Sequence, residues 1–314
     1  MDLIKGIVYR STGSWYTVKS DQGKFFEARI KGKFRNKDIK TTNPIAVGDL
    51  VSFSIKEDGK GWIEEIHPRK NYMIRKSVNL SKEAHIIGSN IDLCVLVVTV
   101  SNPVTSTGFI DRFTVTAAAY DIPILLVFNK LDIYGLEDKQ LLEEYIAVYE
   151  KAGYDCLVTS AAKNIAVDKL KSKLESKTVL FSGHSGAGKS SLINAMNPSL
   201  DLPTGELSEA HLKGKHTTTF AEMFDLSSTI RLIDTPGIKG FGLIDLEKHE
   251  LAQFFPEMFA LSSNCKFNNC VHINEPGCAV LEALNNGEIA DFRYQSYFSM
   301  YNDDAQETYR ALNY

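Results

Sequence analysis

Short apolar stretches separated by turn-forming residues fill the first 68 residues of the chain. Segment 24–30 partly alternates apolar and polar positions, as a half-buried strand does. Turn signals ending in Gly23 and Gly59 separate such segments. We predict five strands, at residues 3–10, 14–20, 24–30, 47–56 and 61–67. So many strands in so short a segment indicate an oligonucleotide-binding (OB) type of β-barrel, with a small SH3-like barrel as the alternative.

Beyond residue 90 the pattern changes to nearly continuous apolar runs separated by helix-forming stretches. The runs predict strands at 91–100, 122–128, 155–159, 178–182 and 230–233, with helices such as 136–152 and 166–172 between them. Uninterrupted apolar runs are typical of parallel strands buried on both faces, so we predict a doubly wound α/β sheet. A basic linker, Arg69-Lys70 and Arg75-Lys76, precedes it, and helices follow residue 237. The predicted domains are 1–68, 69–244 and 245–314.

A phosphate-binding loop follows the predicted strand 178–182. Residues 183–190 match G-x-x-x-x-G-K-S and are followed by helix-forming residues, the context that this motif requires. Its glycines let backbone N–H groups turn toward phosphates, and the helix N-terminus adds positive potential. We expect Lys189 to reach the β- and γ-phosphates and Ser190 to ligate Mg²⁺. The nucleotide-binding candidates here are Gly183, His184, Ser185, Gly186, Ala187, Gly188, Lys189, Ser190 and Ser191.

A motif that selects the base comes earlier, at the end of strand 122–128. Asp132 can accept hydrogen bonds from N1–H and the N2 amine of guanine, a donor pair that adenine lacks. Asn129 is expected to fix the other edge of the base, with the stem of Lys130 beside the ring. A four-residue motif alone is often an ordinary loop, but the sequence after the next predicted strand resembles the loop that offers a backbone N–H to guanine O6. The base-site candidates are Asn129, Lys130, Leu131, Asp132, Ser160 and Ala161.

Two later segments are expected to respond to the γ-phosphate. Asp234 ends strand 230–233 and should hold Mg²⁺ directly or through water, while the Gly237 N–H meets the γ-phosphate. Upstream, the run Gly-Lys-His-Thr-Thr-Thr at 214–219 looks like a switch segment. We expect Thr218 of this run to close on the metal and the γ-phosphate.

The residue after Gly237 is Ile238, where many GTPases carry a glutamine that orients the attacking water. An isoleucine side chain has no hydrogen-bonding group. The sequence therefore predicts a slow intrinsic rate, with the missing group supplied by His216, by Lys239 or by a partner in trans.

Four potential metal ligands crowd into fourteen positions near the C-terminus. Cys265, Cys270, His272 and Cys278 form a Cys₃His set surrounded by turn-forming residues, which is typical of a closed structural zinc site. In a reducing compartment such a cluster favours metal over a disulfide. The alternative is three buried thiols and a surface histidine.

Composition and charge narrow the class of protein. The 314 residues are 44% hydrophobic and 24% charged, as in a soluble globular protein. The apolar run 91–100 is too short to span a bilayer, and the first residues lack the apolar core of a signal peptide, so we predict a cytoplasmic protein with no membrane partner. Net charge is −4. Residues 1–70 nevertheless carry 14 Lys and Arg against 9 Asp and Glu, a net of +5, which leaves −9 for the rest.

The basic N-terminal region favours a phosphate-rich partner, although an ordinary solvated surface explains the charge equally well. Loop 31–37 packs cations around Phe34. This arrangement suits RNA, because phosphates attract the cations and a base can stack on the ring. Alternatively, Phe34 caps the core of the barrel.

The guanine-nucleotide motifs stand in an unusual order. An ordinary GTPase runs phosphate loop, Asp-x-x-Gly, then Asn-Lys-x-Asp. Here the base motif at 129–132 precedes the phosphate loop at 183–190, and Asp-Thr-Pro-Gly at 234–237 comes last. With the N-terminal barrel, the segment 216–219 and the Cys₃His set, this order closely resembles the circularly permuted GTPases of the ribosome small-subunit-dependent GTPase A family. The resemblance covers essentially the whole chain, and Ile238 fits the hydrophobic residue that members carry there.

The resemblance implies a multidomain protein: an OB-type barrel, a circularly permuted α/β P-loop GTPase and a C-terminal helical zinc-binding domain. It implies GTP and GDP with Mg²⁺ and one structural Zn²⁺ as cofactors. It also implies late maturation of the 30S ribosomal subunit, hydrolysis stimulated by that subunit, and contact of the barrel and the zinc domain with 16S rRNA. We further predict a monomer.

Two other functions stay open. A P-loop kinase or ATPase acting on a small molecule is opposed by Asn129 and Asp132. A non-catalytic RNA-binding module whose affinity is gated by nucleotide is left open by Ile238.

Overall fold

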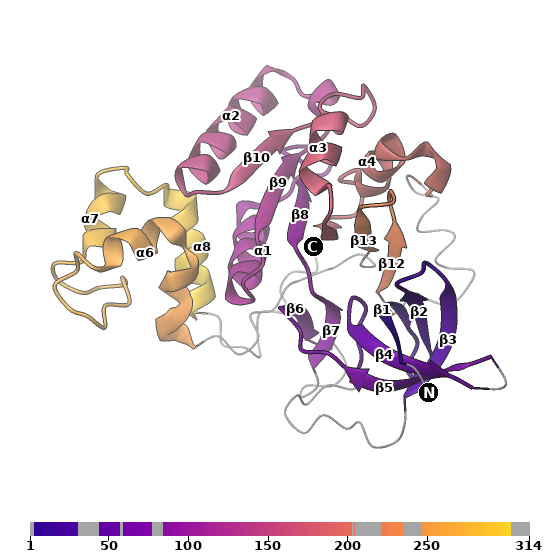
Figure 1. Cartoon of the computed structure of the whole chain (residues 1–314). Coiled ribbons are helices and arrows are strands. Elements are labelled where there is room, and N and C mark those ends of the chain that lie inside the picture. The colour runs from indigo at the N-terminus through magenta and orange to yellow at the C-terminus, as the bar shows by residue number, and fades with distance from the viewer. Residues whose placement is uncertain are drawn as a thin grey trace.

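The computed structural model describes residues 3–30, 44–56, 59–76, 84–202, 204, 221–234 and 247–302. Figure 1 shows three parts: an N-terminal barrel, a central α/β part and a C-terminal helical part. The barrel and the helical part contact different sides of the α/β part.

The barrel consists of five strands, as the alternating pattern predicts. They are β1 (Ile4–Ser11), β2 (Tyr16–Ser20), β3 (Phe25–Ile30), β4 (Leu50–Ile55) and β5 (Gly61–Ile66). The order β1-β2-β3-β5-β4 is closed by pairing of β1 with β4, and only β3 and β5 run parallel among these pairs. Val8, Val18, Phe53 and Ile63 fill its interior. This closed five-stranded order confirms the OB type over the SH3-like alternative.

The segment predicted as a basic linker instead begins a small sheet. Strands β6 (Tyr72–Lys76) and β7 (Ala84–Ser89) pair antiparallel. Met73 and Ile87 are buried in the main core, so apolar packing rather than charge decides the structure here. Arg69 is not a solvated cation either. Its guanidinium binds both carboxylate oxygens of the buried Asp49 at 2.7 Å.

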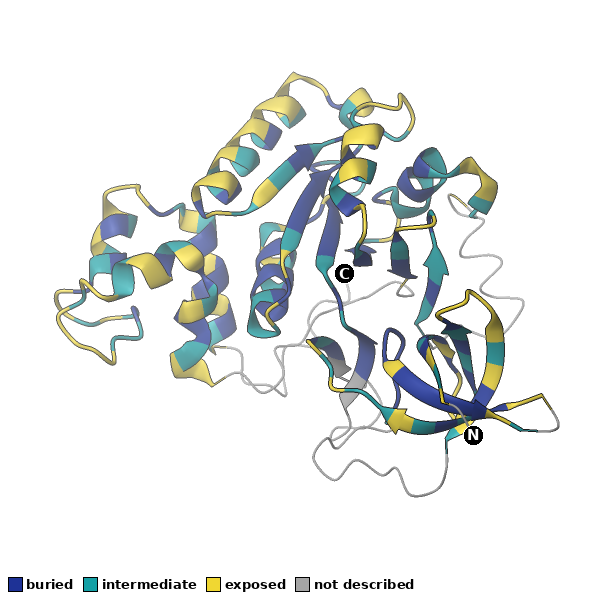
Figure 2. Ribbon diagram, viewed as in Figure 1, coloured by how far each residue is buried: buried dark blue, intermediate teal, exposed yellow. Residues whose placement is uncertain are grey.

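The central part is the predicted doubly wound sheet. Five parallel strands lie in the order β10 (Asp155–Val158), β9 (Ile124–Phe128), β8 (Leu93–Val98), β11 (Thr178–Gly183) and β13 (Arg231–Asp234). Alternate side chains of each strand enter different cores: Leu96 packs with helices α1 (Thr107–Ala119) and α2 (Leu136–Lys151), whereas Val97 packs with α3 (Val167–Leu174) and α4 (Lys189–Met196). Figure 2 shows these strands buried along most of their length. Burial on both faces explains their unbroken apolar runs.

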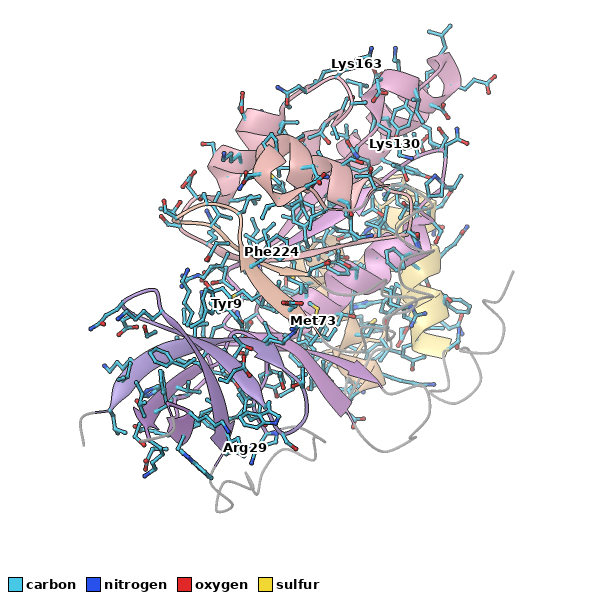
Figure 3. The ribbon with its side chains drawn as sticks, turned by 90° about the vertical axis from the view of Figure 1, so that its right-hand side faces the viewer. Tyr9, Arg29, Met73, Lys130, Lys163 and Phe224 are labelled. Carbon is cyan, nitrogen blue, oxygen red and sulfur yellow. The ribbon has the colours of Figure 1, made fainter. Side chains whose placement is uncertain are left out.

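One strand joins the sheet to the barrel. The short strand β12 (Glu222–Asp225), which the sequence pattern did not predict, pairs antiparallel with β13 and with β1 at Arg10–Glu222. Barrel and sheet therefore share one continuous eleven-stranded arrangement. In Figure 3, Tyr9 and Met73 lie at this junction, and Lys130 lies at the opposite end of the α/β part.

The C-terminal part contains η3 (Lys248–Phe254), α6 (Pro256–Ser262), α7 (Ala279–Asn285) and α8 (Asp291–Asn302). Phe255, Met258, Val280 and Tyr297 form its core. Helix α8 packs on α1 of the central part. Within the described ranges, every helix is too short or too polar to cross a membrane.

Candidate nucleotide and metal sites

Two glycines of the phosphate loop occupy positions that no other residue fits. Gly183 ends β11 with φ of 143°, and a Cβ there would lie 2.4 Å from the carbonyl oxygen of Val97. Gly188 caps α4 with φ of 94°, and its Cβ would lie 2.3 Å from the side-chain nitrogen of Asn129. Both backbones take the left-handed side of φ that glycine adopts without penalty. The motif glycines are thus needed for turning and for close approach to the base motif.

Lys189 is held over the phosphate loop. Its ammonium donates to the carbonyl oxygens of Gly183 at 2.6 Å and His184 at 2.9 Å. Burial lowers the pKa of Lys189, and the carboxylate of Asp234 opposes that shift. Asp234 pairs with Phe181 across β13 and β11, so it ends a strand beside the loop. Ser190 and Ser191 begin α4 and are partly buried.

The buried Asn129 side chain connects three segments that are distant in sequence. Its amide nitrogen donates to the carbonyl oxygen of Ala187 in the phosphate loop at 3.0 Å. Its amide oxygen accepts from the Thr159 hydroxyl at 3.1 Å and from the Ala161 N–H at 3.3 Å. The structure therefore brings the base motif, the loop after β10 and the phosphate loop together. Thr159 begins the segment 159–162 that resembles the guanine O6 loop, but the contact of its hydroxyl with Asn129 was not predicted.

The rest of the base motif forms a tight turn. Lys130 has the left-handed conformation, φ 68° and ψ 32°, and its ammonium donates to the carbonyl oxygen of Asn102 at 2.5 Å. Leu131 donates its N–H to the carbonyl of Thr159 at 3.1 Å. The Ser160 hydroxyl donates to the Asp132 carboxylate. Ser160 thus orients Asp132 with its side chain, a contact beyond the backbone role that its sequence position suggested.

The loop that follows β8 and the first turn of α1 lie against the phosphate loop. The ring of Phe109 lies 4.0 Å from that of His184, centroid to centroid. Pro103 sits 3.5 Å from the position of a Cβ at Gly186. Burial and the nearby Lys189 lower the pKa of His184. None of these neighbours has a sequence signal, since their contacts arise only when β8 and β11 pair.

Several predicted residues lie outside the described ranges. They are the phosphate-responsive candidates His216, Thr218, Gly237, Ile238 and Lys239, and the basic loop around Phe34.

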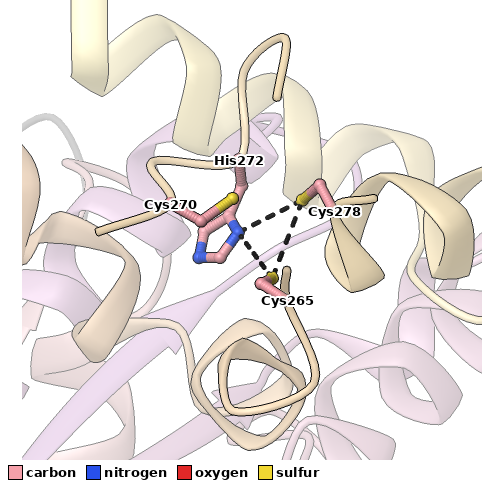
Figure 4. A group of neighbouring side chains, drawn as sticks. All are labelled: Cys265, Cys270, His272 and Cys278. Carbon is pink, nitrogen blue, oxygen red and sulfur yellow. Dashed lines mark hydrogen bonds between the residues drawn. The ribbon is translucent and has the colours of Figure 1, made fainter. Parts of the chain in front are cut away.

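The four predicted metal ligands converge. Cys265, Cys270, His272 and Cys278 place their ligand atoms within 4.8 Å of one another (Figure 4). His272 Nδ1 lies 3.3 Å from the Cys278 sulfur and 3.6 Å from the Cys265 sulfur, and those two sulfurs are 4.0 Å apart. One ion of tetrahedral preference fits between such atoms. The alternative of three buried thiols and a surface histidine is wrong, because His272 is 2% exposed whereas Cys265 and Cys270 are only partly buried.

Hydrogen bonds outside the ligand set hold its loop in place. The Glu275 carboxylate accepts from the N–H groups of Val271 and Ile273, both at 2.8 Å. The Tyr294 hydroxyl donates to the His272 carbonyl at 2.8 Å, and the Tyr297 hydroxyl to the Val271 carbonyl at 2.5 Å. Such outer contacts orient ligands before an ion binds.

Comparison with known proteins agrees with this geometry. A family model described as RsgA GTPase matches residues 66–244, and one described as RsgA N-terminal domain matches residues 5–63. A protein of Christiangramia forsetii named Small ribosomal subunit biogenesis GTPase RsgA is 54% identical over 314 residues, covering 99% of both chains. A protein of the same name from Flavobacterium johnsoniae is 56% identical over 311 residues, covering 98% of this chain and 95% of its own.

Two solved structures share the whole fold. The crystal structure of YjeQ from Thermotoga maritima has a TM-score of 0.79 at 34% identity, covering 96% of this chain and 98% of that one. YloQ, described as a circularly permuted GTPase, has a TM-score of 0.73 at 29% identity, covering 96% of this chain and 94% of its own. The permuted motif order predicted from the sequence is thereby confirmed.

Proposed function

The chain belongs to the RsgA GTPase family, and we propose that this GTP-hydrolysing enzyme binds the small (30S) ribosomal subunit and assists its late maturation. The subunit stimulates hydrolysis of GTP to GDP and phosphate in this proposal. One observation carries the nucleotide part: Asn129 reaches from the base motif to the Ala187 carbonyl at 3.0 Å, so the two halves form one site despite their order in the chain. The names of the relatives support the subunit as partner.

The residues of the site have distinct proposed roles. Asp132, held by Ser160, accepts N1–H and the N2 amine of guanine, and Asn129 holds the surrounding loops. Lys130 lies along the base through its stem, and the Ala161 N–H, which donates to the Asn129 amide oxygen at 3.3 Å, is offered to guanine O6 as well. The N–H groups of residues 183–191 bind the phosphates at the N-terminus of α4. Lys189 neutralises the β- and γ-phosphates.

Ser190 and Asp234 would hold Mg²⁺. Ser190 lies in the first turn of α4 and Asp234 ends β13, the neighbour of the strand that leads into the phosphate loop, and a hydroxyl and a carboxylate are suitable hard oxygen donors. When bound there, Mg²⁺ would supply positive charge beside the phosphate oxygens. We further propose that Thr218 and the Gly237 N–H close on the γ-phosphate. His216 helps position the attacking water, with which the Ile238 side chain cannot form a hydrogen bond.

We propose zinc for the Cys₃His site. A tetrahedral ion with bonds of about 2.3 Å to sulfur and about 2.0 Å to nitrogen requires ligand atoms roughly 3.5–3.8 Å apart. The separations of 3.3, 3.6 and 4.0 Å bracket that range. With all four positions taken by protein, the role is structural.

The barrel is the proposed contact with 16S rRNA. The Arg29 guanidinium lies 3.7 Å from the ring centroid of Trp15, and the Lys60 ammonium lies 5.5 Å from it. Phe25 is 55% exposed. Half-exposed Trp15 and exposed Phe25 beside cations suit stacked bases and phosphates. Domain boundaries at 68/69 and 244/245, cytoplasmic location and a monomeric state complete the proposal.

Phosphate release from GTP, measured with and without purified 30S subunits, tests this function. The Lys189→Ala variant provides the blank, because it lacks the cation on the phosphates. We expect slow release alone and strong stimulation by the subunits. Equal rates with and without subunits, with GTP still tightly bound, would instead support a nucleotide-gated rRNA-binding module.

A further inference from the structure

The Tyr134 hydroxyl connects the ends of β8 and β9 next to the base motif, where the hydrogen bonds between the two strands stop. Strands β8 and β9 run parallel with Val98 opposite Phe128, and the N–H of Asn129 donates to the Val98 carbonyl at 2.9 Å. If the ladder continued, the N–H of Val100 would next donate to the Asn129 carbonyl. Instead, the Tyr134 hydroxyl donates to the Asn129 carbonyl at 2.5 Å and accepts from the Val100 N–H at 3.1 Å. The phenol oxygen thus bridges the two strands where they separate.

The hydroxyl is suited to donating this bond. Tyr134 is only 5% exposed, and burial raises its pKa to about 12, although the bond from Val100 acts in the opposite direction. The phenol therefore stays protonated at neutral pH. Asn129 and Val100 are also buried, so few water molecules can replace the phenol oxygen.

The carbonyl that Tyr134 holds belongs to the peptide that turns into Lys130. Lys130 is left-handed, a conformation that is uncommon for residues other than glycine and persists only where its surroundings enforce it. Asp132 lies two residues further along the same turn. Holding the Asn129 carbonyl therefore fixes the direction in which Asp132 presents its carboxylate.

The same hydroxyl also anchors the loop on the other side. Val100 begins the segment that carries Asn102, whose carbonyl accepts the Lys130 ammonium at 2.5 Å. Pro103 then approaches Gly186 of the phosphate loop. One phenol oxygen thus contacts both segments that flank Lys130.

We propose that Tyr134 is a positioning residue for guanine recognition: its hydroxyl replaces a sheet hydrogen bond and thereby aims the base motif. The proposal rests on the proposed guanine site at residues 129–132. It predicts that Tyr134 affects discrimination between bases and not only stability, since Asp132 supplies the contact to the guanine N2 amine.

The test compares GDP with inosine diphosphate, which lacks that amine, in equilibrium binding to the full chain. For Tyr134→Phe, which removes the phenol oxygen from both the Asn129 carbonyl and the Val100 N–H, we expect GDP to bind about tenfold more weakly. We expect the affinity for inosine diphosphate to fall by a smaller factor, so that the preference for GDP over inosine diphosphate decreases. Tyr149→Phe is the matched control, because it removes another buried tyrosine hydroxyl, bonded to Asp111 at 2.8 Å, from the same core. This control should keep both affinities and their ratio.

The outcomes distinguish an error in the proposed guanine site from an error in the role given to Tyr134. If the unmodified protein does not prefer GDP over inosine diphosphate, the guanine site itself is wrong and the role of Tyr134 with it. If the unmodified protein discriminates and Tyr134→Phe does so equally, Tyr134 does not position the motif. An equal loss for both nucleotides, with a lowered melting temperature, would show a structural role and would overturn the proposal as well.

Discussion

The barrel and the helical C-terminal part are each joined to the central sheet by a carboxylate, a cation and a tyrosine, but the two joints differ in burial. In the C-terminal joint, Asp111 of α1 binds Arg293 of α8 at 2.5 Å, with side-chain exposures of 0% and 1%. In the barrel joint, Asp225 of β12 binds Lys19 of β2 at 2.5 Å, with exposures of 34% and 26%. The same kind of ion pair is therefore buried in the C-terminal joint and partly exposed to solvent in the barrel joint.

The buried joint is surrounded by further partners. Arg293 also binds both oxygens of Glu257 at 2.6 and 3.1 Å, and its guanidinium lies 4.8 Å from the ring centroid of Phe255. Burial alone would lower the pKa of Arg293, but Asp111 and Glu257 raise it well above its usual value. Neither charge has water to replace a lost partner, so this joint is sensitive to any single change.

The barrel joint combines a buried ring with half-exposed charges. Tyr9 packs in the main core beside Met223 and Ile233, and its hydroxyl donates to Asp225 at 2.7 Å. Water can solvate Lys19 and Asp225 if they separate, so the charges add little. This weaker joint lies on β12. Strand β12 pairs with β13, which ends at Asp234 beside the phosphate loop. The difference predicts that losing one charge costs more stability at the C-terminal joint than at the barrel joint.

Removing the zinc proposed for the Cys₃His site should break the C-terminal joint most completely. Structural zinc in small domains contributes about 10–16 kcal/mol of apparent binding free energy. We expect chelation, or Cys278→Ser, to remove the metal and to unfold residues 247–302, and hydrogen exchange of α8 would report it. Cys156→Ser, a thiol outside the cluster, should retain the metal and the protection of α8. Protection of α8 that survives metal loss would contradict a structural role.

Arg293→Ala tests the buried joint directly. It leaves Asp111 and Glu257 facing no cation, so we expect a loss of about 3–5 kcal/mol in the free energy of unfolding, measured in urea. Lys151→Ala is the control, because Lys151 makes an exposed bond to the Glu288 carbonyl between the same two parts. If Arg293→Ala lowers the free energy of unfolding no more than Lys151→Ala does, the buried ion pair does not make the C-terminal joint the stronger of the two.

Tyr9→Phe tests the barrel joint while keeping the ring in the core. Only the hydrogen bond to Asp225 is lost, and Asp225 keeps Lys19 and water, so we expect about 0.5–1.5 kcal/mol of destabilisation. Calorimetric melting of the full chain measures it. Destabilisation approaching that of Arg293→Ala would show that the barrel is held as firmly as the helical part.

Of these substitutions, Arg10→Ala should lower the free energy of unfolding least. Arg10 and Glu222 pair at 3.1 Å with side chains 50% and 47% exposed, so we expect at most about 1 kcal/mol, reduced further by salt. Urea unfolding at low and high ionic strength distinguishes this from a packing effect. An effect that does not change with salt would mean that the arginine stem, and not its charge, matters.

The sequence alone determined the features that depend on neighbours along the chain. The phosphate loop is recognisable because its glycines, its lysine and the flanking strand and helix are contiguous, and the metal ligands lie within fourteen positions of one another. The strands of the sheet were predicted because burial on both faces leaves an unbroken apolar run. The permuted order followed from reading these motifs in sequence.

Only the tertiary structure decided which distant residues meet. Thr159 and Tyr134 complete the base motif through contacts made possible by adjacent strands, and Asp111 meets Arg293 across 182 positions. The charges at residues 69–76 predict a basic linker where β6 lies, whereas the packing of Met73 in the main core has no signal in the sequence. Periodicity and local turn preferences act between neighbours in the chain, but hydrogen-bond partners and buried ion pairs are chosen by three-dimensional packing, which no local pattern encodes.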